Sequence, residues 1–192
     1  MMKDIILDHL KQSKVPSSIA SMLSSIGNVE EVRTKSVIVE IGAMCNRIFF
    51  VLEGGLVSQY LTESGSYKTV NFYLGNLQSF VTIPNSYFLH EKSSFRLKAI
   101  TQSQVVSFEK EVLDQLVAES SEFRDWYQKK IIHTLVEEYS SKSNIITMSS
   151  KEMYQYLLRE QPEVIRSVPS TYIAQYLGIS REHLSRMRKE IG

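Results

Sequence analysis

The spacing of apolar residues changes twice along this sequence, and these two changes constrain the fold more than any other feature. From Glu31 to about Glu109, apolar residues form short β-type runs with turn residues between them. Before and after this region they recur at intervals of three and four, as in amphipathic helices. Many short strands at nearly even spacing predict a barrel or a double-sheet roll. The sequence therefore predicts an α+β chain in which a β-roll lies between helical segments.

Turn residues mark the limits of the expected strands. Gly54 with Gly55, and Gly65, suit hairpin turns because glycine adopts a positive φ without steric cost. Before the roll, Pro16 separates two short helical segments within residues 1–30. The expected strands contain the runs 37–39, 48–52, 56–57, 70–73, 95–100 and 105–108.

A long amphipathic pattern follows the roll. A break near Ser120 divides it into a short helix and a long one. The long helix carries more apolar and aromatic surface than a small roll can cover, so we expect a homodimer seam, ahead of packing within its own chain. The polar run 140–144 predicts a hinge. The expected seam residues are Phe123, Trp126, Tyr127, Ile131 and Leu135.

The segment from Val168 to Glu190 has the pattern of a helix-turn-helix. Ala174 is small where two steeply crossing helices approach most closely, and Gly178 allows the sharp turn between them. Another helix is expected over 149–159, ending before Pro162. The apolar residues expected to share the small core are Ile173, Leu177, Ile179, Leu184 and Met187.

Positive charge concentrates in this segment. The stretch 166–189 contains Arg166, Arg181, Arg186, Arg188 and Lys189 against Glu182 alone, whereas the whole chain has a formal net charge of +1. Ser170 and Ser180 are predicted to cap the two helices, whose free amide groups would then face a docking phosphate. The expected phosphate contacts are Ser170, Thr171, Ser180, Arg188 and Lys189.

One face of the second helix carries side chains that can read bases. The expected base contacts, which share a face by their helical spacing, are Arg181, Glu182, Ser185 and Arg186. Arginine can donate two hydrogen bonds to guanine O6 and N7, and a carboxylate can accept one from cytosine N4. The alternative is a solvated helix with surface ion pairs, such as Glu182 with Arg186. Because the turn framework accompanies these charges, the sequence favours double-stranded DNA as the partner.

The segment from Ile179 to Arg186 resembles the recognition helix of the CRP/FNR (catabolite activator) superfamily of bacterial transcription regulators. The order of roll, long helix and helix-turn-helix is similar too, and Gly42, Glu53 and Gly54 match the family pattern in the roll. The resemblance implies a cyclic-nucleotide-binding-like β-roll, which is a double-stranded jelly roll, and a winged helix-turn-helix. It also implies a homodimer on a pseudo-palindromic DNA site, with RNA polymerase as a candidate partner.

Three parts of the chain follow from these patterns. We expect the roll with its N-terminal helices over residues 1–110, the dimerisation helices over 111–142 and the helix-turn-helix DNA-binding domain over 143–192. Gly192 follows the recognition helix directly. We therefore expect the wing to be reduced or its phosphate contacts to be lost.

The resemblance breaks where family members bind cyclic AMP, since those members look alike in a glycine-glutamate pair that holds the ribose and an arginine-serine pair that holds the cyclic phosphate. Here Ile83 lies near the place of the glutamate, and Ser93 and Ser94 occupy the arginine-serine place. Burying an anionic phosphate without a cation has a large desolvation cost, so we expect no cyclic AMP binding and no cofactor. Residues 79–88 predict a pocket closed into packed core, ahead of a site for a less charged effector.

Other classes of protein are disfavoured by what the sequence lacks. Cys45 is the only cysteine, which excludes an internal disulfide framework. The histidines have no spacing used for zinc, so no metal site is expected; they are His9, His90, His133 and His183. No phosphate-cradling loop or nucleophile motif indicates an enzyme. The N-terminal residues form no signal-peptide block and no run could span a bilayer, so we expect a cytoplasmic protein without membrane contact.

The leading prediction is a homodimeric, sequence-specific DNA-binding transcription regulator that is not an enzyme. The first alternative is a ligand-sensing β-roll whose C-terminal helices bind a protein partner. A cupin-like metal enzyme ranks below both, because cupins need clustered histidine and acidic ligands that the sequence lacks.

Overall fold

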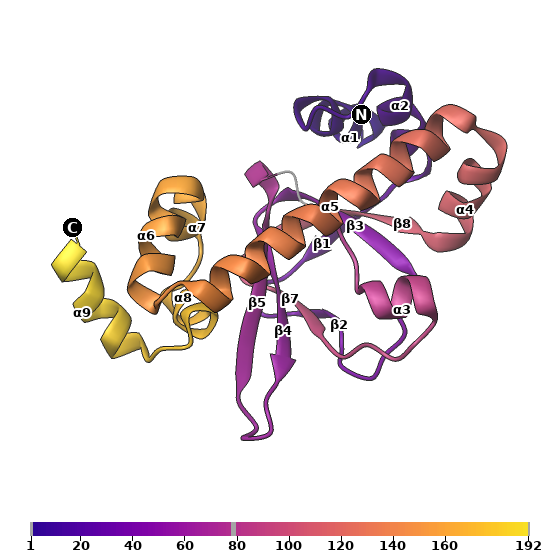
Figure 1. Cartoon of the computed structure of the whole chain (residues 1–192). Coiled ribbons are helices and arrows are strands. Elements are labelled where there is room, and N and C mark those ends of the chain that lie inside the picture. The colour runs from indigo at the N-terminus through magenta and orange to yellow at the C-terminus, as the bar shows by residue number, and fades with distance from the viewer. Residues whose placement is uncertain (1, 78–79, 192) are drawn as a thin grey trace.

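The computed structural model describes residues 2–77 and 80–191 of the chain. In this part of the chain the strands form two four-stranded sheets, with helices before and after them. Figure 1 shows the N-terminal helices near one end of a long helix and the C-terminal helices at its other end, with the strands alongside. The α+β fold with a double-sheet roll, predicted from the sequence, is confirmed.

The two sheets of the roll are antiparallel and enclose a common core. Across the first sheet the strands are β1 (Asn28–Val32), β8 (Ser103–Glu109), β3 (Arg47–Glu53) and β6 (Phe80–Val81). Across the second they are β2 (Val37–Val39), β7 (Arg96–Ala99), β4 (Gly55–Leu61) and β5 (Tyr67–Leu74). Phe49 and Val51 from the first sheet meet Leu56 and Leu97 from the second, and all four are fully buried. Each strand run expected from the sequence overlaps one of these strands.

A glycine turn joins β3 to β4, as expected. Gly54 has a φ of +74°, and a Cβ atom there would lie 2.3 Å from the carbonyl oxygen of Gln102. Both the backbone angle and the close approach therefore require glycine. Gly65, in the β4–β5 hairpin, also has a positive φ.

Short helices complete the roll. The two predicted N-terminal helices are α1 (Met2–Gln12) and α2 (Ser17–Ile26), with Pro16 at the N-cap of the second. Their buried residues pack against one side of the roll, in a cluster that contains Ile6, Leu10, Ile19, Leu23, Phe50 and Phe108. A 3-10 turn, η1 (Gly75–Leu77), follows β5, and α3 (Pro84–Leu89) precedes β7.

The predicted break in the helical region after the roll lies at Ser120, between α4 (Lys110–Glu119) and α5 (Ser121–Thr147). The predicted hinge over 140–144 is absent from its expected place, because α5 continues through these residues. Within this run, Ser140 Oγ bonds back to the helix by donating to the Val136 carbonyl at 2.9 Å, and just beyond the run Thr147 Oγ1 does the same to the Ser143 carbonyl at 2.8 Å.

The two halves of α5 differ in what they contact. Phe123 is 0% exposed and packs in the core with the N-terminal helices and the roll, while Trp126 and Tyr127 are half-buried against the same cluster. Phe123 therefore has no surface left for a partner subunit, which corrects its expected place in the dimer seam. Ile131 is half-buried. Leu135 is 68% exposed, and the large apolar side chains exposed beside it are Ile132, Val136 and Tyr139.

The C-terminal helices are α6 (Ser150–Glu160), α7 (Pro162–Ser167), α8 (Ser170–Leu177) and α9 (Arg181–Ile191). Ser149 caps α6 in a reciprocal pair with Glu152, in which each side chain accepts from the other's backbone amide. The sequence did not predict α7, whose first turn contains Pro162. Proline is favoured at that position because the first amides of a helix have no helical acceptor.

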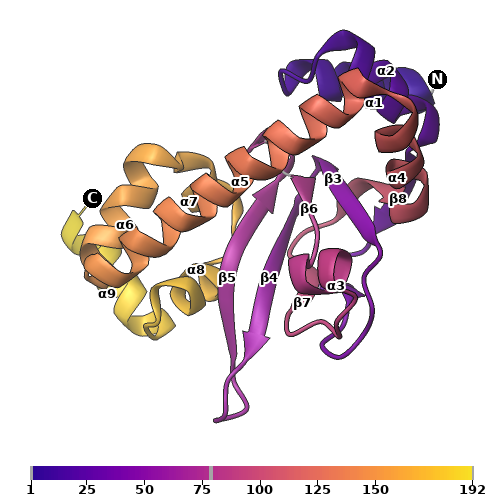
Figure 2. The same cartoon turned by 45° about the vertical axis from the view of Figure 1, so that its right-hand side comes forward.

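The C-terminal helices pack directly on the roll. Figures 1 and 2 show α8 beside β5, at the same end of α5 as α6. Val57, Phe72 and Leu74 from the second sheet, with Ile100 directly after β7, share one buried cluster with the cores of α6, α7, α8 and α9. The roll thus positions the terminal helices by apolar contact as well as by chain connection.

Candidate nucleic-acid interface

The turn between α8 and α9 has the geometry that its glycine predicts. Gly178 lies at the C-cap of α8 in the left-handed conformation, with φ 68° and ψ 28°. The next amide, that of Ile179, donates to the Ala174 carbonyl at 3.0 Å and closes the turn. Ala174 is itself buried. The framework of a helix-turn-helix is therefore present.

A small apolar core holds the two helices together. Ile173 and Leu177 from α8 and Leu184 and Met187 from α9 are buried, and Ile179 packs against them half-buried. All five residues predicted for this core lie in it. Because these side chains occupy one side of α9, its opposite side faces outward.

The two expected helix caps have different outcomes. Ser180 Oγ accepts from the amide of His183 at 3.1 Å, so Ser180 caps α9 as predicted. Ser170 does not cap α8, because Pro169 holds the N-cap position with φ −56° and ψ 137°. Ser170 is instead the first helical residue, where it is half-buried, and Thr171 beside it is exposed.

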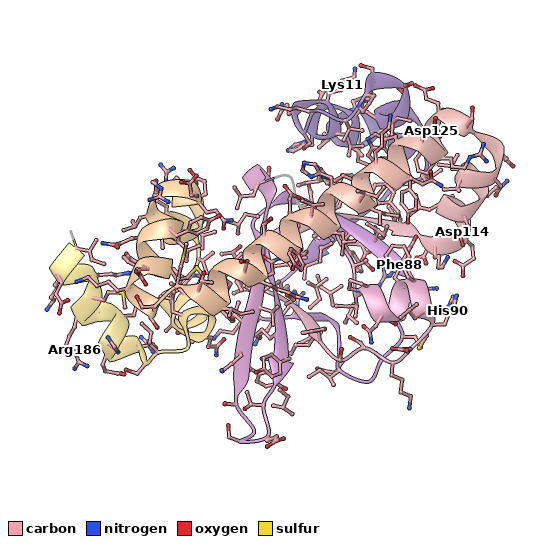
Figure 3. All side chains as sticks on the ribbon, in the orientation of Figure 1. Lys11, Phe88, His90, Asp114, Asp125 and Arg186 are labelled. Atoms are coloured by element: carbon pink, nitrogen blue, oxygen red, sulfur yellow. The ribbon has the colours of Figure 1, made fainter. Side chains whose placement is uncertain are left out.

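The structure brings most of the predicted contact residues into one hollow beside α9. The residues that line it are Ser170, Arg181, Glu182, Leu184, Ser185, Arg186 and Arg188. All four expected base contacts are in this set, with two of the expected phosphate contacts. Thr171, Ser180 and Lys189 are exposed nearby in sequence but do not line the hollow. Figure 3 shows Arg186 directed away from the rest of the molecule.

Glu182 is an ionised acceptor on this face. Its own backbone amide and the Ser180 hydroxyl lower the pKa of the Glu182 carboxyl, and the charges of Arg181 and Arg186 lower it further. No salt bridge joins Glu182 to Arg186 among the residues described. The carboxylate accepts hydrogen bonds from these two local donors and, within the described part of the chain, forms no ion pair that would neutralise its charge.

Arg188 and Arg166 carry positive charge in different surroundings. Arg188 is half-buried, its guanidinium lies 5.9 Å from the centroid of the Tyr154 ring, and its buried Nε has no hydrogen-bond partner in the described structure. Arg188 also lines the hollow beside α9. Arg166 forms an ion pair with Glu163 on α7, which offsets its share of the local charge excess. The basic character of the segment therefore depends on α9.

In the roll, the positions at which family members bind cyclic AMP carry no cation in this chain. Ile83 is buried in the core. Ser93 is buried too, and its hydroxyl is engaged locally, donating to the Phe95 carbonyl and accepting from the Phe95 amide at 3.2 Å. Ser94 is exposed. Within the expected pocket segment 79–88, residue 79 lies outside the described residues.

Between 2 and 77 and between 80 and 191, no cluster of three or more histidine, cysteine, aspartate or glutamate side chains could hold a metal ion. None of the helices in these ranges is both long and apolar enough to cross a bilayer.

Solved structures with the same fold cover nearly the whole chain. The c-di-GMP responsive global regulator CLP of Xanthomonas campestris has a TM-score of 0.69 at 14% identity, over 92% of this chain and 91% of that one. FixK2 from Bradyrhizobium japonicum has a TM-score of 0.69 at 14% identity, over 86% and 84%. A protein from Eubacterium rectale assigned to the CRP/FNR family of transcriptional regulators has a TM-score of 0.65 at 15% identity, over 94% and 85%.

The likeness is one of structure, since no protein-family model and no curated protein matches the sequence. It extends over the roll, the long helix and the terminal helices together. The fold of this chain is therefore that of the CRP/FNR transcriptional regulators, as the resemblance in its sequence predicted.

Proposed function

We propose that this protein is a homodimeric, sequence-specific DNA-binding transcription regulator that places α9 in a major groove. The observation that carries the proposal is the hollow beside α9, which is lined by Arg181, Glu182 and Arg186. Arginines that donate in pairs to guanine and a carboxylate that accepts from cytosine are directional groups, so they read sequence as well as charge. The half-site of this regulator contains guanine.

Dimerisation is supported by the second half of α5. Ile132, Leu135, Val136 and Tyr139 are all exposed, at the i, i+3, i+4 and i+7 spacing that forms one stripe on a helix. Such a stripe on a two-fold axis would pair α5 with its copy and present two α9 helices to successive major grooves, about 34 Å apart. A pseudo-palindromic site follows from that symmetry. The regulator acts in the bacterial cytoplasm, with RNA polymerase as a candidate partner.

Cyclic AMP is not the effector in this proposal. Ile83 and Ser93, at two of the positions implied for the ligand, are buried and offer no charge. Tyr87 from α3 is buried in the cluster shared with the N-terminal helices, where its hydroxyl accepts a hydrogen bond from Tyr127 of α5 at 3.2 Å. Without a buried cation, the cyclic phosphate would lose its water and gain no ion pair.

The test is selection of double-stranded sites from random DNA, followed by mobility-shift titration of the selected palindrome. Arg186→Ala removes a bidentate donor and should weaken binding by about 1–3 kcal/mol per half-site, with relaxed preference at one base pair. Lys11→Ala is the matched control, because Lys11 is an exposed cation on α1 at the opposite end of the molecule (Figure 3). It should leave the affinity unchanged.

A second variant separates phosphate contact from base reading. Lys189→Ala should weaken binding to all sequences alike and make the slope of log affinity against log salt less steep by about 0.9 per half-site, or about 1.8 for the dimer on its palindrome. Unchanged binding by Arg186→Ala would contradict base reading by α9. A wild-type protein that retains no DNA from the random pool would favour the alternative in which the terminal helices bind a protein.

A further inference from the structure

One strand of the roll, β5, contacts both α5 and α8, and these two helices also contact each other directly where the Tyr176 side chain of α8 is hydrogen-bonded to Ser141 of α5. Consecutive residues of a strand point to opposite faces, and on β5 these are Asn71 and Phe72. Asn71 Nδ2 donates to Glu138 Oε1 of α5 at 2.6 Å. The Phe72 ring lies 5.0 Å, between centroids, from the ring of Tyr176 on α8. β5 therefore connects the long helix to the first helix of the helix-turn-helix (Figure 2).

A polar contact fixes the orientation of α8 on this face. Gln175 Oε1 accepts two hydrogen bonds from the roll, from Gln59 Nε2 at 2.6 Å and from Thr69 Oγ1 at 3.1 Å. Gln59 is fully buried. Both donors lie on adjacent strands, Gln59 on β4 and Thr69 on β5, so a single side-chain oxygen of α8 is tied to two strands.

The direction of these bonds is determined by an arginine. Arg96 Nε and Nη2 donate to Gln59 Oε1 at 3.0 and 2.9 Å, and the guanidinium also stacks 3.1 Å above the centroid of the Tyr67 ring. Arginine has no acceptor, so the carbonyl end of Gln59 must face it and the amide end must face Gln175. The bonds from Arg96 through Gln59 to Gln175 Oε1 therefore have a fixed direction.

Directional hydrogen bonds of this kind fix the angle of α8 relative to the roll, which apolar packing alone does not. The shared apolar cluster holds α8 against the roll, but such surfaces can shift while remaining in contact. Hydrogen bonds weaken steeply away from their preferred angle, so the two bonds to Gln175 resist rotation of α8. α9 is joined rigidly to α8 by their common core. The position of α9 relative to α5 is therefore set partly at Gln175.

We infer that the contact of Gln175 with Gln59 and Thr69 determines which spacing between half-sites the dimer accepts. This inference rests on the proposed function. Each base pair added between half-sites moves one of them by about 3.4 Å and turns it by about 35° around the DNA axis. A dimer that holds α9 stiffly accepts one spacing, and a dimer with a looser α8 accepts several. Gln175 is a positioning residue that faces the roll.

The experiment measures affinity for a series of palindromes that differ only in spacer length, together with the isolated half-site. Gln175→Leu removes the acceptor, and the ratio of affinities between the best spacing and its neighbours should fall at least about tenfold, while half-site affinity stays the same. Gln175→Glu is the matched control, because its carboxylate accepts from the same amide and hydroxyl donors. It should keep the wild-type ratio.

Thr69→Val gives a second variant of nearly the same shape, which removes one donor and should produce a smaller fall in the same ratio. A variant that is merely less stable would weaken all spacings equally, so the ratio reports positioning and the circular dichroism melt reports folding. An unchanged ratio in Gln175→Leu overturns the inference, as does an equal loss of half-site affinity. Failure of the wild-type protein to bind any palindrome would instead overturn the proposed function, and this inference with it.

Discussion

The two halves of α5 should respond in opposite ways to loss of a side chain. Phe123→Ala removes a ring that is 0% exposed and lies 5.6 and 5.8 Å, between centroids, from the rings of Trp126 and Tyr127. Truncation of a buried phenylalanine typically lowers the free energy of unfolding by about 3–5 kcal/mol. Because no part of Phe123 reaches the surface, its loss should leave the affinity between folded subunits nearly unchanged.

Leu135→Ala should have the reverse effect. Leu135 is 68% exposed in one chain, so a dimer seam along α5 would bury about two thirds of a leucine side chain, a gain of about 1–2 kcal/mol. A two-fold interface contains the residue twice, which gives about 2–4 kcal/mol per dimer and raises the dimer dissociation constant about 30- to 900-fold. Alanine keeps the helix, since it has the highest helix propensity.

Sedimentation velocity over a dilution series measures the dissociation constant, and urea unfolding at fixed protein concentration measures stability. A dimer constant that is unaffected by Leu135→Ala would refute the assignment of the seam to the second half of α5. A stable Phe123→Ala protein with weakened dimers would refute the division between the two halves.

Two further predictions concern the backbone and pH. Gly178→Ala should lower the free energy of unfolding by about 1–2 kcal/mol, measured in urea. The cost comes from the left-handed backbone alone, because φ is 68° and an added Cβ atom would meet nothing within 4 Å. An unchanged free energy of unfolding would contradict this. Burial raises the pKa of the Glu138 carboxyl in the folded protein above its usual 4.5. The free energy of unfolding should therefore fall as the pH rises from the pKa of Glu138 in the unfolded chain through its pKa in the folded protein, and stay level at higher pH. Glu138→Gln keeps an acceptor for Asn71 and should remove this pH-dependent fall. The melting temperature of the variant at pH 7 should then be no lower than that of the wild type. A melting temperature that falls equally with pH in both proteins would contradict the role of Glu138.

Much of this architecture could be predicted because it depends on local chemistry. The turn at Gly178 and the cap at Ser180 follow from the residues at those positions and their immediate neighbours. The alternation of apolar residues in the strands follows from the burial of one sheet face. Each of these signals lies within a few residues of the structure that it predicts.

The features that could not be predicted depend on contacts with distant residues. The spacing of apolar residues put Phe123 and Leu135 on one stripe of the helix. Which half of that stripe is covered depends on the tertiary fold, which buries Phe123 and leaves Leu135 exposed. The polar run 140–144 looked like a hinge because serine favours turns in isolation, whereas its hydroxyls can equally bond back within a helix. Gln175 gave no signal, because its partner Gln59 lies 116 residues away in sequence.

The buried cluster that Val57, Phe72, Leu74 and Ile100 share with the terminal helices has a consequence for how the protein is made. Synthesis proceeds from the N-terminus, so the strands β4 and β5 and the residue Ile100, which together supply these four side chains, leave the ribosome before α6, α7, α8 and α9. We therefore expect the last helices to complete their apolar core against a surface that was synthesised earlier. A ribosome that stalls within them would release a roll with exposed apolar side chains and no complete helix-turn-helix, and we expect chaperones and proteases to act on such a product.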